Sequence, residues 1–330
     1  MKQLLAALSI IGLLLTFISE TGSAGTQVKP SRLCPLPWKG SASSGDDCQK
    51  KTLKLTTFSV LSGEFREINV AIRNGYLEEN PSVPFRGNVI YYEGLGDSML
   101  NHMPLFQELT NAGYRVIAFD YMGQGGSEGS MDDTRMLEIS NLGNIIWSLH
   151  ARDLAHFPNK NIIGWSTGGL AAYSQVTSDF ELKNIVLIAP GIAPNSIVGE
   201  QHLLRGEIDL ITLPTLTTQQ YTSGRIKNPH VDPIKPNSPL KVPSFALDLK
   251  TAALCEESAP IPLDINGFVL LSGDKDTYVD AEKTRRIIKA QAPRFQIRQY
   301  PGALHEIDNE AAPNGPAARI DILNFLNSVN

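Results

Sequence analysis

The sequence predicts an α/β fold built on a mostly parallel, eight-stranded sheet with helices on both faces. From residue 88 onward, six short apolar runs alternate with helical stretches, which is typical of parallel strands buried on both faces. One of these runs leads through Gly164-Trp165-Ser166-Thr167-Gly168 into a helical segment. A serine therefore stands at a sharp strand-to-helix turn, where the positive end of the helix dipole favours a developing negative charge.

Two antiparallel strands are expected to open the sheet, over Leu53–Val60 and Phe65–Ile72, because apolar positions alternate in both segments. The six buried runs follow at Asn88–Tyr92, Arg115–Phe119, Asn161–Gly164, Asn184–Ala189, Gly267–Leu271 and Phe295–Tyr300. Ser166 thus follows the fifth strand. After the sixth strand the alternation stops over about residues 192–259, where we expect a cap that shapes access to the serine.

Composition and the first residues limit the class of protein. The chain has 330 residues, 42% of them hydrophobic, and a net charge of -5 with scattered Lys and Arg, so nucleic acid is not an expected partner. Residues 1–24 are typical of a secretory signal peptide, with Lys2, an apolar stretch and small residues before Gly25; an uncleaved membrane anchor is the alternative. We expect export to the periplasm or the extracellular medium, a polar extension over 25–50, and one α/β domain over 51–330.

Export would allow disulfides, and we predict that Cys34 pairs with Cys48 because both flank a Pro/Ser/Gly-rich segment with little else to order it. Cys255 is the third cysteine, so pairings that include it, or three unpaired thiols, stay open.

A serine nucleophile needs a base within hydrogen-bond reach and a carboxylate that orients the base. In folds with this turn, the acid and then the histidine follow the serine along the chain. Only one of the six histidines, His305, lies beyond the last predicted strand, and we assign it as the base. The oxyanion needs two N–H donors. We expect them at Thr167, directly after the serine, and at Leu95 in the glycine-containing loop after the third strand, with Gly96 as the alternative.

The chain resembles the monoglyceride lipase and lysophospholipase branch of the α/β-hydrolase superfamily over roughly residues 86–310. The resemblance lies in Gly94-Leu95-Gly96, the serine turn, Gly273 to Asp276 with His305 and, most specific to the branch, Asp120-Tyr121-Met122-Gly123-Gln124-Gly125-Gly126-Ser127. It implies the α/β-hydrolase fold and hydrolysis of a carboxylic ester through an acyl-enzyme, with no cofactor and no metal.

The resemblance also selects the acid. In related hydrolases it stands three residues after the glycine that ends the seventh strand, which selects Asp276; Asp274 and Asp280 are the alternatives.

The chain departs from the branch at two positions beside the site. It has Glu93 where members usually have a histidine before the oxyanion glycine, and Trp165 where they have a histidine before the nucleophile. An inward-facing carboxylate would oppose an oxyanion, so we expect Glu93 to point away or to be hydrogen-bonded. We expect Trp165 to pack under the turn. The cap also lacks long aliphatic runs, which disfavours a bulky lipid substrate.

The leading hypothesis is an exported serine hydrolase of lysophospholipid, monoacylglycerol or small acyl esters, which contacts a membrane or micelle surface only transiently. A proline-type aminopeptidase is the second hypothesis, with Glu207 or Asp209 of the cap as the anchor for a substrate amine. A non-catalytic exported binding module is the third. No oligomeric state is indicated.

Overall fold

The described part of the chain begins at residue 50. The computed structural model describes residues 50–59, 64–129, 136–153, 160–176, 179, 181–195, 210–211, 240–241, 252–253, 255–256, 261, 264–273, 275–276 and 278–330. All of them belong to one unit, residues 31–330. The expected signal peptide, Cys34 and Cys48 lie outside the described residues, so export and the disulfide stay predictions.

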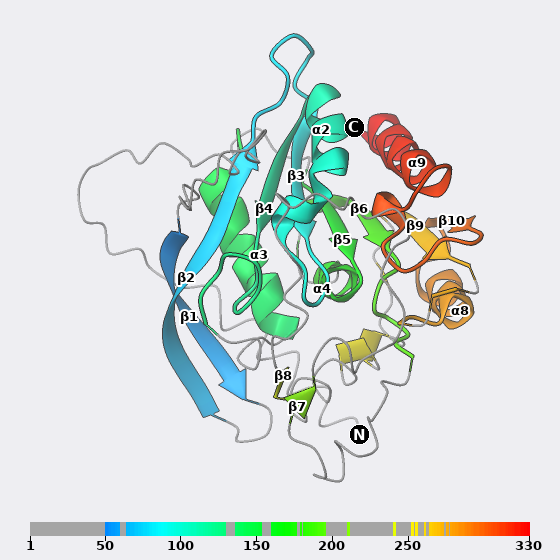
Figure 1. Cartoon of the computed structure of the whole chain (residues 1–330). Coiled ribbons are helices and arrows are strands. Elements are labelled where there is room, and N and C mark those ends of the chain that lie inside the picture. Colours follow the sequence, from blue (N-terminus) through cyan, green and yellow to red (C-terminus); the bar gives the residue numbers. More distant parts are fainter. Residues whose placement is uncertain are drawn as a thin grey trace. The chain divides into compact units, whose positions relative to one another are not determined.

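Eight strands form one sheet, which confirms the predicted architecture (Figure 1). They are β1 (Lys50–Ser59), β2 (Glu64–Leu77), β3 (Gly87–Tyr92), β4 (Tyr114–Phe119), β5 (Lys160–Trp165), β6 (Leu182–Ile188), β9 (Asn266–Ser272) and β10 (Gln296–Tyr300). Their spatial order is β1-β2-β4-β3-β5-β6-β9-β10, and neighbours from β4 to β10 are parallel. The loops that follow the parallel strands therefore emerge at one edge of the sheet.

The opening hairpin is longer than expected. Its second strand was expected to end at Ile72, whereas β2 continues to Leu77. The first part of β2 pairs with β1, and Asn74–Leu77 pair antiparallel with β4. Asn74 and Gly75 interrupt the apolar alternation, so the local pattern ends there although pairing with β4 extends the strand.

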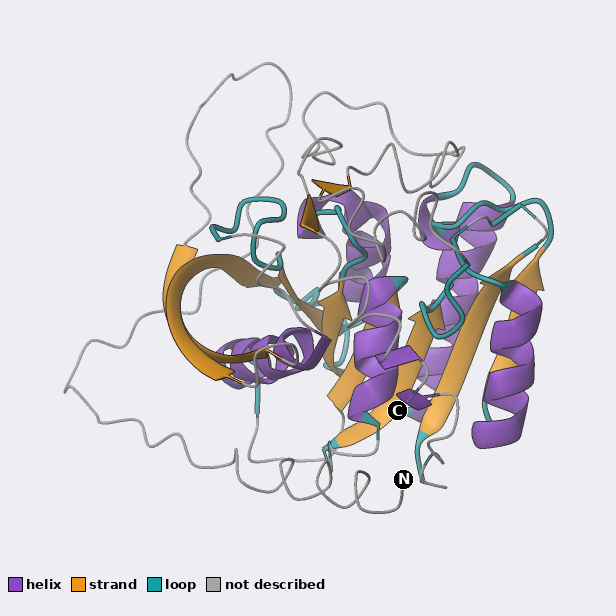
Figure 2. Ribbon diagram, turned by 90° about the horizontal axis from the view of Figure 1, so that it is seen from below, coloured by secondary structure: helices purple, strands orange, loops and turns teal. Residues whose placement is uncertain are grey.

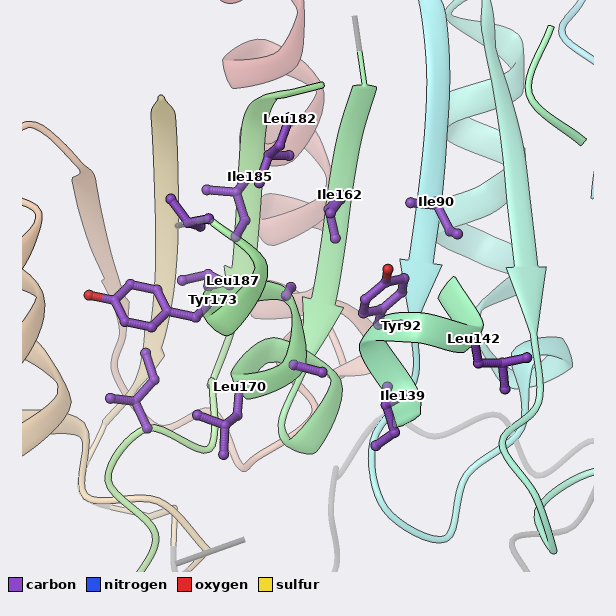
Figure 3. Close-up of a cluster of buried hydrophobic side chains, with 14 of the residues drawn as sticks. Ile90, Tyr92, Ile139, Leu142, Ile162, Leu170, Tyr173, Leu182, Ile185 and Leu187 are labelled. Atoms are coloured by element: carbon purple, nitrogen blue, oxygen red, sulfur yellow. The ribbon is translucent and has the colours of Figure 1, made fainter. Parts of the chain in front are cut away.

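Helices cover both faces of the sheet (Figure 2). Alternate residues of β3 face opposite ways: Ile90 and Tyr92 join one buried cluster, whereas Val89 and Tyr91 join the other. The first cluster includes side chains of α3 (Met136–His150), α4 (Thr167–Gln175) and α8 (Ala281–Gln291), and Figure 3 shows part of it. The second includes α2 (Met103–Asn111) and α9 (Asn314–Val329). Each fully buried aliphatic side chain contributes about 1.5–3 kcal/mol, so the two clusters hold the helices on the sheet.

Part of the expected cap is described. Within residues 192–259, β7 (Leu210–Ile211) and β8 (Leu240–Lys241) pair antiparallel in a small second sheet. Most of the remaining residues of this segment lie outside the described ranges, so its role as a cap stays a prediction. Among the described helices, none combines the length and the apolar composition needed to cross a membrane.

A row of asparagine side chains joins the amino ends of four parallel strands. Asn161 on β5 donates to the main-chain oxygen of Asn88 on β3, at 2.9 Å, and accepts from Asn184 on β6, at 2.8 Å. Asn266 on β9 in turn donates to Asn184, at 2.9 Å. The side chain of Asn330 donates to Asn161 and accepts from Asn184, at 3.2 and 3.0 Å. We call these five residues the asparagine row; it fixes the end of the sheet opposite the loops that follow β3, β5 and β9.

Asn161→Ala is expected to lower the free energy of unfolding by about 3 kcal/mol, because it leaves several buried amide groups of the asparagine row without partners. Urea denaturation measures the change. Asn111→Ala, at the exposed end of α2, is the matched control and should change stability by less than about 0.5 kcal/mol. Equal effects of the two substitutions would contradict a stabilising role for the row.

Candidate active site

Ser166 occupies a strained turn between β5 and α4. Its backbone has φ 55° and ψ -118°, a conformation that non-glycine residues rarely adopt. The turn brings the backbone of α4 close to the end of β3, since a Cβ atom at Gly168 would lie 2.3 Å from the main-chain oxygen of Tyr92. The Ser166 N–H donates to the oxygen of Ile188 on β6, at 3.0 Å. These contacts hold the serine at the carboxyl edge of the sheet.

Three predicted side chains meet at this edge. The Nε2 atom of His305 lies 2.8 Å from Ser166 Oγ, and its Nδ1 atom lies 2.9 Å from Asp276 Oδ2. Ser166 follows β5, Asp276 follows β9 and His305 follows β10, so the parallel sheet brings together residues up to 139 positions apart. The ring of Tyr278 stacks on that of His305, with centroids 4.8 Å apart, and fixes its plane.

The Asp276 carboxylate is buried but well supplied with donors. Its Oδ2 accepts from Ser272 Oγ at 2.8 Å, and its Oδ1 accepts from the main-chain N–H groups of Tyr278 and Val279, at 2.8 and 3.1 Å. Burial by itself raises the pKa of Asp276, but His305 and these donors outweigh burial and bring the pKa below its usual value. Asp276 is therefore ionised at neutral pH and can stabilise an imidazolium at His305.

The alternatives for the acid have other positions. Asp280 is the N-cap of α8, where its Oδ1 accepts from Lys283 N at 2.8 Å. Asp274 lies outside the described residues, as do Glu207 and Asp209 of the aminopeptidase hypothesis.

The loop after β3 passes beside the serine turn and is held by Gln124. The Gly96 N–H donates to Gln124 Oε1 at 2.6 Å, and Gln124 Nε2 donates to Glu93 Oε1 and to Gly94 O, at 2.8 and 3.1 Å. The Gly96 N–H thus has an acceptor, which disfavours the alternative donor at Gly96. Leu95 in this loop and Thr167 at the start of α4 stay predictions. Gln124 belongs to the glycine-rich segment after β4, so this segment supports the loop.

Glu93 is buried and hydrogen-bonded, as expected. Its Oε1 accepts from Tyr121 N at 3.0 Å as well as from Gln124, whereas Oε2 has no hydrogen-bond partner among the described residues. Burial, together with the nearby carboxylates of Asp120 and Asp97, raises the pKa of Glu93 well above its usual value. These effects favour the neutral form of Glu93, which adds no negative charge beside the loop of Leu95.

Trp165 packs under the turn, as expected. The side chain is fully buried, and the Trp165 Nε1–H donates to the main-chain oxygen of His305 at 3.1 Å. The indole ring also lies 5.6 Å from the ring of His102, centroid to centroid. Gly94 leaves room for this ring, since a Cβ atom there would lie 2.3 Å from Trp165 Cζ3. Trp165 thus supports the loop that carries the histidine.

The sequence interpretation missed a second group of buried polar side chains behind Trp165. His102 lies between Asp97 and Asp308, and Glu306 is nearby; all four side chains are fully buried. Asp97, His102 and Glu306 each place one potential ligand atom within 4.8 Å of the others, so they are the described residues that best match a metal-binding group. A signal existed, since Asp97 follows Gly96 directly and Asp308 stands three residues after His305.

Comparison with known proteins agrees with the predicted fold. The sequence pattern of the serine aminopeptidase S33 family matches residues 84–312. The monoacylglycerol lipase of Paleococcus ferrophilus has a similar structure, with a TM-score of 0.65 and 19% identity over 80% of this chain and 100% of that one. A soluble variant of the monoglyceride lipase of Saccharomyces cerevisiae has a TM-score of 0.64 and 16% identity over 90% of this chain and 99% of that one. Est1E of Butyrivibrio proteoclasticus, solved with ferulic acid bound, has a TM-score of 0.55 and 13% identity over 79% of this chain and 96% of that one.

Glu93→Gln is expected to raise the free energy of unfolding at pH 8 by on the order of 1 kcal/mol. A carboxyl whose pKa is raised by folding costs stability as the pH rises above its unfolded pKa, and a neutral amide removes that cost. Urea denaturation at pH 5 and pH 8 should show a gain that grows with pH. Glu93→Ala should instead destabilise at both values, because Tyr121 N and Gln124 Nε2 lose an acceptor. A pH-independent loss with Gln would contradict a neutral Glu93.

Asp276→Asn is expected to destabilise the protein above about pH 4 and progressively less below it. Because folding lowers the pKa of Asp276, its carboxylate contributes stability above the unfolded pKa, and this contribution is lost as the pH falls through the folded pKa. The test is urea denaturation of both proteins from pH 7 to pH 3. Glu67→Gln, at a largely exposed carboxylate, is the control. A difference in the free energy of unfolding between wild type and Asp276→Asn that widens on acidification would contradict the lowered pKa of Asp276.

Proposed function

Because the chain belongs to the serine aminopeptidase S33 family of α/β-hydrolases, we propose that it is an exported serine hydrolase that cleaves carboxylic esters through an acyl-enzyme on Ser166. The observation that carries the proposal is the continuous hydrogen-bonded series from Ser166 Oγ through His305 to Asp276, at 2.8 and 2.9 Å. A nucleophile, a base and a group that orients the base are what acyl transfer to serine requires.

In the acylation step, His305 Nε2 takes the proton of Ser166 as Oγ attacks the ester carbonyl carbon. The carbonyl oxygen becomes an oxyanion, which the N–H groups of Leu95 and Thr167 receive; one such donor is typically worth about 3 kcal/mol in the transition state. The C–O bond to the alcohol then breaks, and His305 returns its proton to the leaving oxygen. Asp276 stabilises the imidazolium formed in between.

In the deacylation step, His305 removes a proton from water, which attacks the acyl-enzyme and passes through a second oxyanion. Collapse releases the acid and returns the proton to Ser166. The neutral state of Glu93 favours both steps, because an ionised carboxylate beside the Leu95 loop would oppose each oxyanion.

The structural neighbours support an ester as the substrate. The three structural neighbours named above include two lipases of monoacylglycerols and one protein with ferulic acid bound. We propose a lysophospholipid, a monoacylglycerol or a small acyl ester, met in solution or by transient contact with a membrane or micelle surface. The family is named after serine aminopeptidases, so peptide hydrolysis stays the second candidate activity.

Export is part of the proposal, with residues 1–24 as the cleaved signal. Mass spectrometry of the protein from the culture medium or periplasm should give a mature chain that starts near Gly25. Recovery of the intact chain from the membrane fraction would favour the uncleaved anchor instead.

The proposed reaction predicts that a fluorophosphonate probe labels Ser166 and that p-nitrophenyl esters are hydrolysed faster than aminoacyl-nitroanilides. Ser166→Ala should abolish labelling, and His305→Gln should lower kcat by at least about 10⁴-fold, because either change removes the nucleophile–base pair. Tandem mass spectrometry locates the adduct and steady-state assays give the rates.

The outcomes separate the three hypotheses. Faster cleavage of the nitroanilides would favour the aminopeptidase, and a folded wild-type protein with neither adduct nor turnover would favour the binding module. Asn111→Ala serves as the control for loss of activity through mutation in general.

A further inference from the structure

One buried histidine has no part in the proposed reaction, although it lies close to the site. His102 ends the short 3-10 helix η1 (Met99–His102) in the loop region after β3. Its Nε2 atom lies 2.6 Å from Asp97 Oδ2 and 3.9 Å from Glu306 Oε1, and its Nδ1 atom lies 2.9 Å from Asp308 Oδ2. Each ring nitrogen therefore faces a carboxylate.

This arrangement fits an imidazolium. A neutral imidazole carries one N–H and can donate to one carboxylate, whereas the protonated ring donates from both nitrogens. Burial opposes the charge, but Asp97 and Asp308 outweigh burial and raise the pKa of His102 well above its usual value. Tyr91, whose hydroxyl lies 3.0 Å from Nδ1, and Glu306 complete the titratable groups that the described structure places against the ring; the aromatic neighbours Phe106 and Trp165 are uncharged.

The two carboxylates belong to two different loops of the site. Asp97 directly follows Gly94-Leu95-Gly96, and Asp308 lies in η3 (Ile307–Asn309), three residues after His305. A second bond joins the same loops, since Asn309 Nδ2 donates to the main-chain oxygen of Asn101 at 3.0 Å. The Trp165 ring contacts both the His102 ring and the His305 ring, with centroids 5.6 and 5.4 Å apart, so the group is also in contact with a residue that supports the loop of the base.

We propose that His102, as an imidazolium, is a positioning residue that fastens the loop of the oxyanion donor Leu95 to the loop of His305. The inference rests on the proposed function, because it assigns these two loops their roles in ester hydrolysis. Positioning at this level matters for rate, since a displacement of about 1 Å at a reacting group can cost about 100-fold.

The contacts favour a proton over a metal ion in this group. Two ligand atoms of one metal at about 2.0–2.2 Å lie more than 3 Å apart in a tetrahedral site, whereas His102 Nε2 and Asp97 Oδ2 are 2.6 Å apart. Amide donors also occupy the carboxylates that a cation would need: Asn101 Nδ2 donates to Asp97 Oδ1 at 2.7 Å, and Asn309 Nδ2 donates to Glu306 Oε1 at 2.6 Å.

The kinetic test compares two buried histidines. His102→Gln should lower kcat for a p-nitrophenyl ester by about 100-fold per folded molecule, with KM changed by less than about threefold, because positioning acts on the transition state. Asp308→Asn keeps His102 and Asp97 and is the second variant, for use where His102→Gln does not fold. It should lower kcat by about tenfold. His150→Gln is the matched control: His150 is buried and bonds Asn74 Oδ1 at 2.6 Å, and its replacement should leave kcat within about threefold.

The outcomes keep this inference separate from the proposed function. A normal kcat in folded His102→Gln and Asp308→Asn, with wild-type turnover intact, overturns the positioning role alone, and so does a change confined to KM. A wild-type protein without turnover or fluorophosphonate labelling overturns the proposed function and the positioning role with it.

A spectroscopic test needs no activity. In the ¹⁵N-histidine-labelled protein at pH 8, one imidazole with protons on both nitrogens should be present and should vanish in His102→Gln but not in His150→Gln. A singly protonated His102, or a ring whose N–H signals appear only after treatment with EDTA, would overturn the imidazolium bridge.

Discussion

The backbone turn at Ser166 is the constraint on which the rest of the site depends. A residue with φ 55° persists only where its surroundings over-determine it, and here β6, β3 and α4 all contact the turn. The close approach of Gly168 to the end of β3 also places the Glu93–Gly96 loop beside the serine. The same backbone geometry that holds Ser166 at the edge of the sheet therefore brings the loop of the proposed oxyanion donor Leu95 within reach.

A buried ion pair supports the loop region that follows β3. Arg73 donates to Asp120 and to Ser98, the latter at 2.7 Å, and Asp120 accepts from Met99 N at 2.8 Å, so a buried ion pair supports the start of η1. A buried ion pair is weak evidence of net stability, but loss of one partner leaves an uncompensated charge that typically costs about 3–5 kcal/mol. Loss of one partner would therefore strongly destabilise the loop region after β3. The intact pair holds this region in one position.

The sequence was sufficient for the architecture, and the structure brings together the predicted side chains of Ser166, His305 and Asp276, the last of which was selected through the family resemblance. The alternation of apolar residues and the continuous apolar runs predicted the eight strands of the main sheet, because these signals are local. The order of residues along the chain selected His305, because that order follows from the topology. The end of β2 was missed because Asn74 and Gly75 lack an apolar pattern and are held by β4. The His102 group was missed for a different reason: its partners Asp97 and Asp308 are 211 residues apart, and their positions beside Gly96 and His305 indicate proximity to the site but not a contact with His102, which forms only after the sheet has formed.

The asparagine row constrains strand register at one end of the sheet and not at the other. Amide groups lock the register of β3, β5, β6 and β9 at their amino ends, where a slip would leave buried donors and acceptors unmatched. The loops that surround Ser166 emerge at the opposite end and do not set that register. Substitutions in those loops can therefore accumulate over evolution without shifting the register of these four strands, so the site can diverge while the scaffold stays the same.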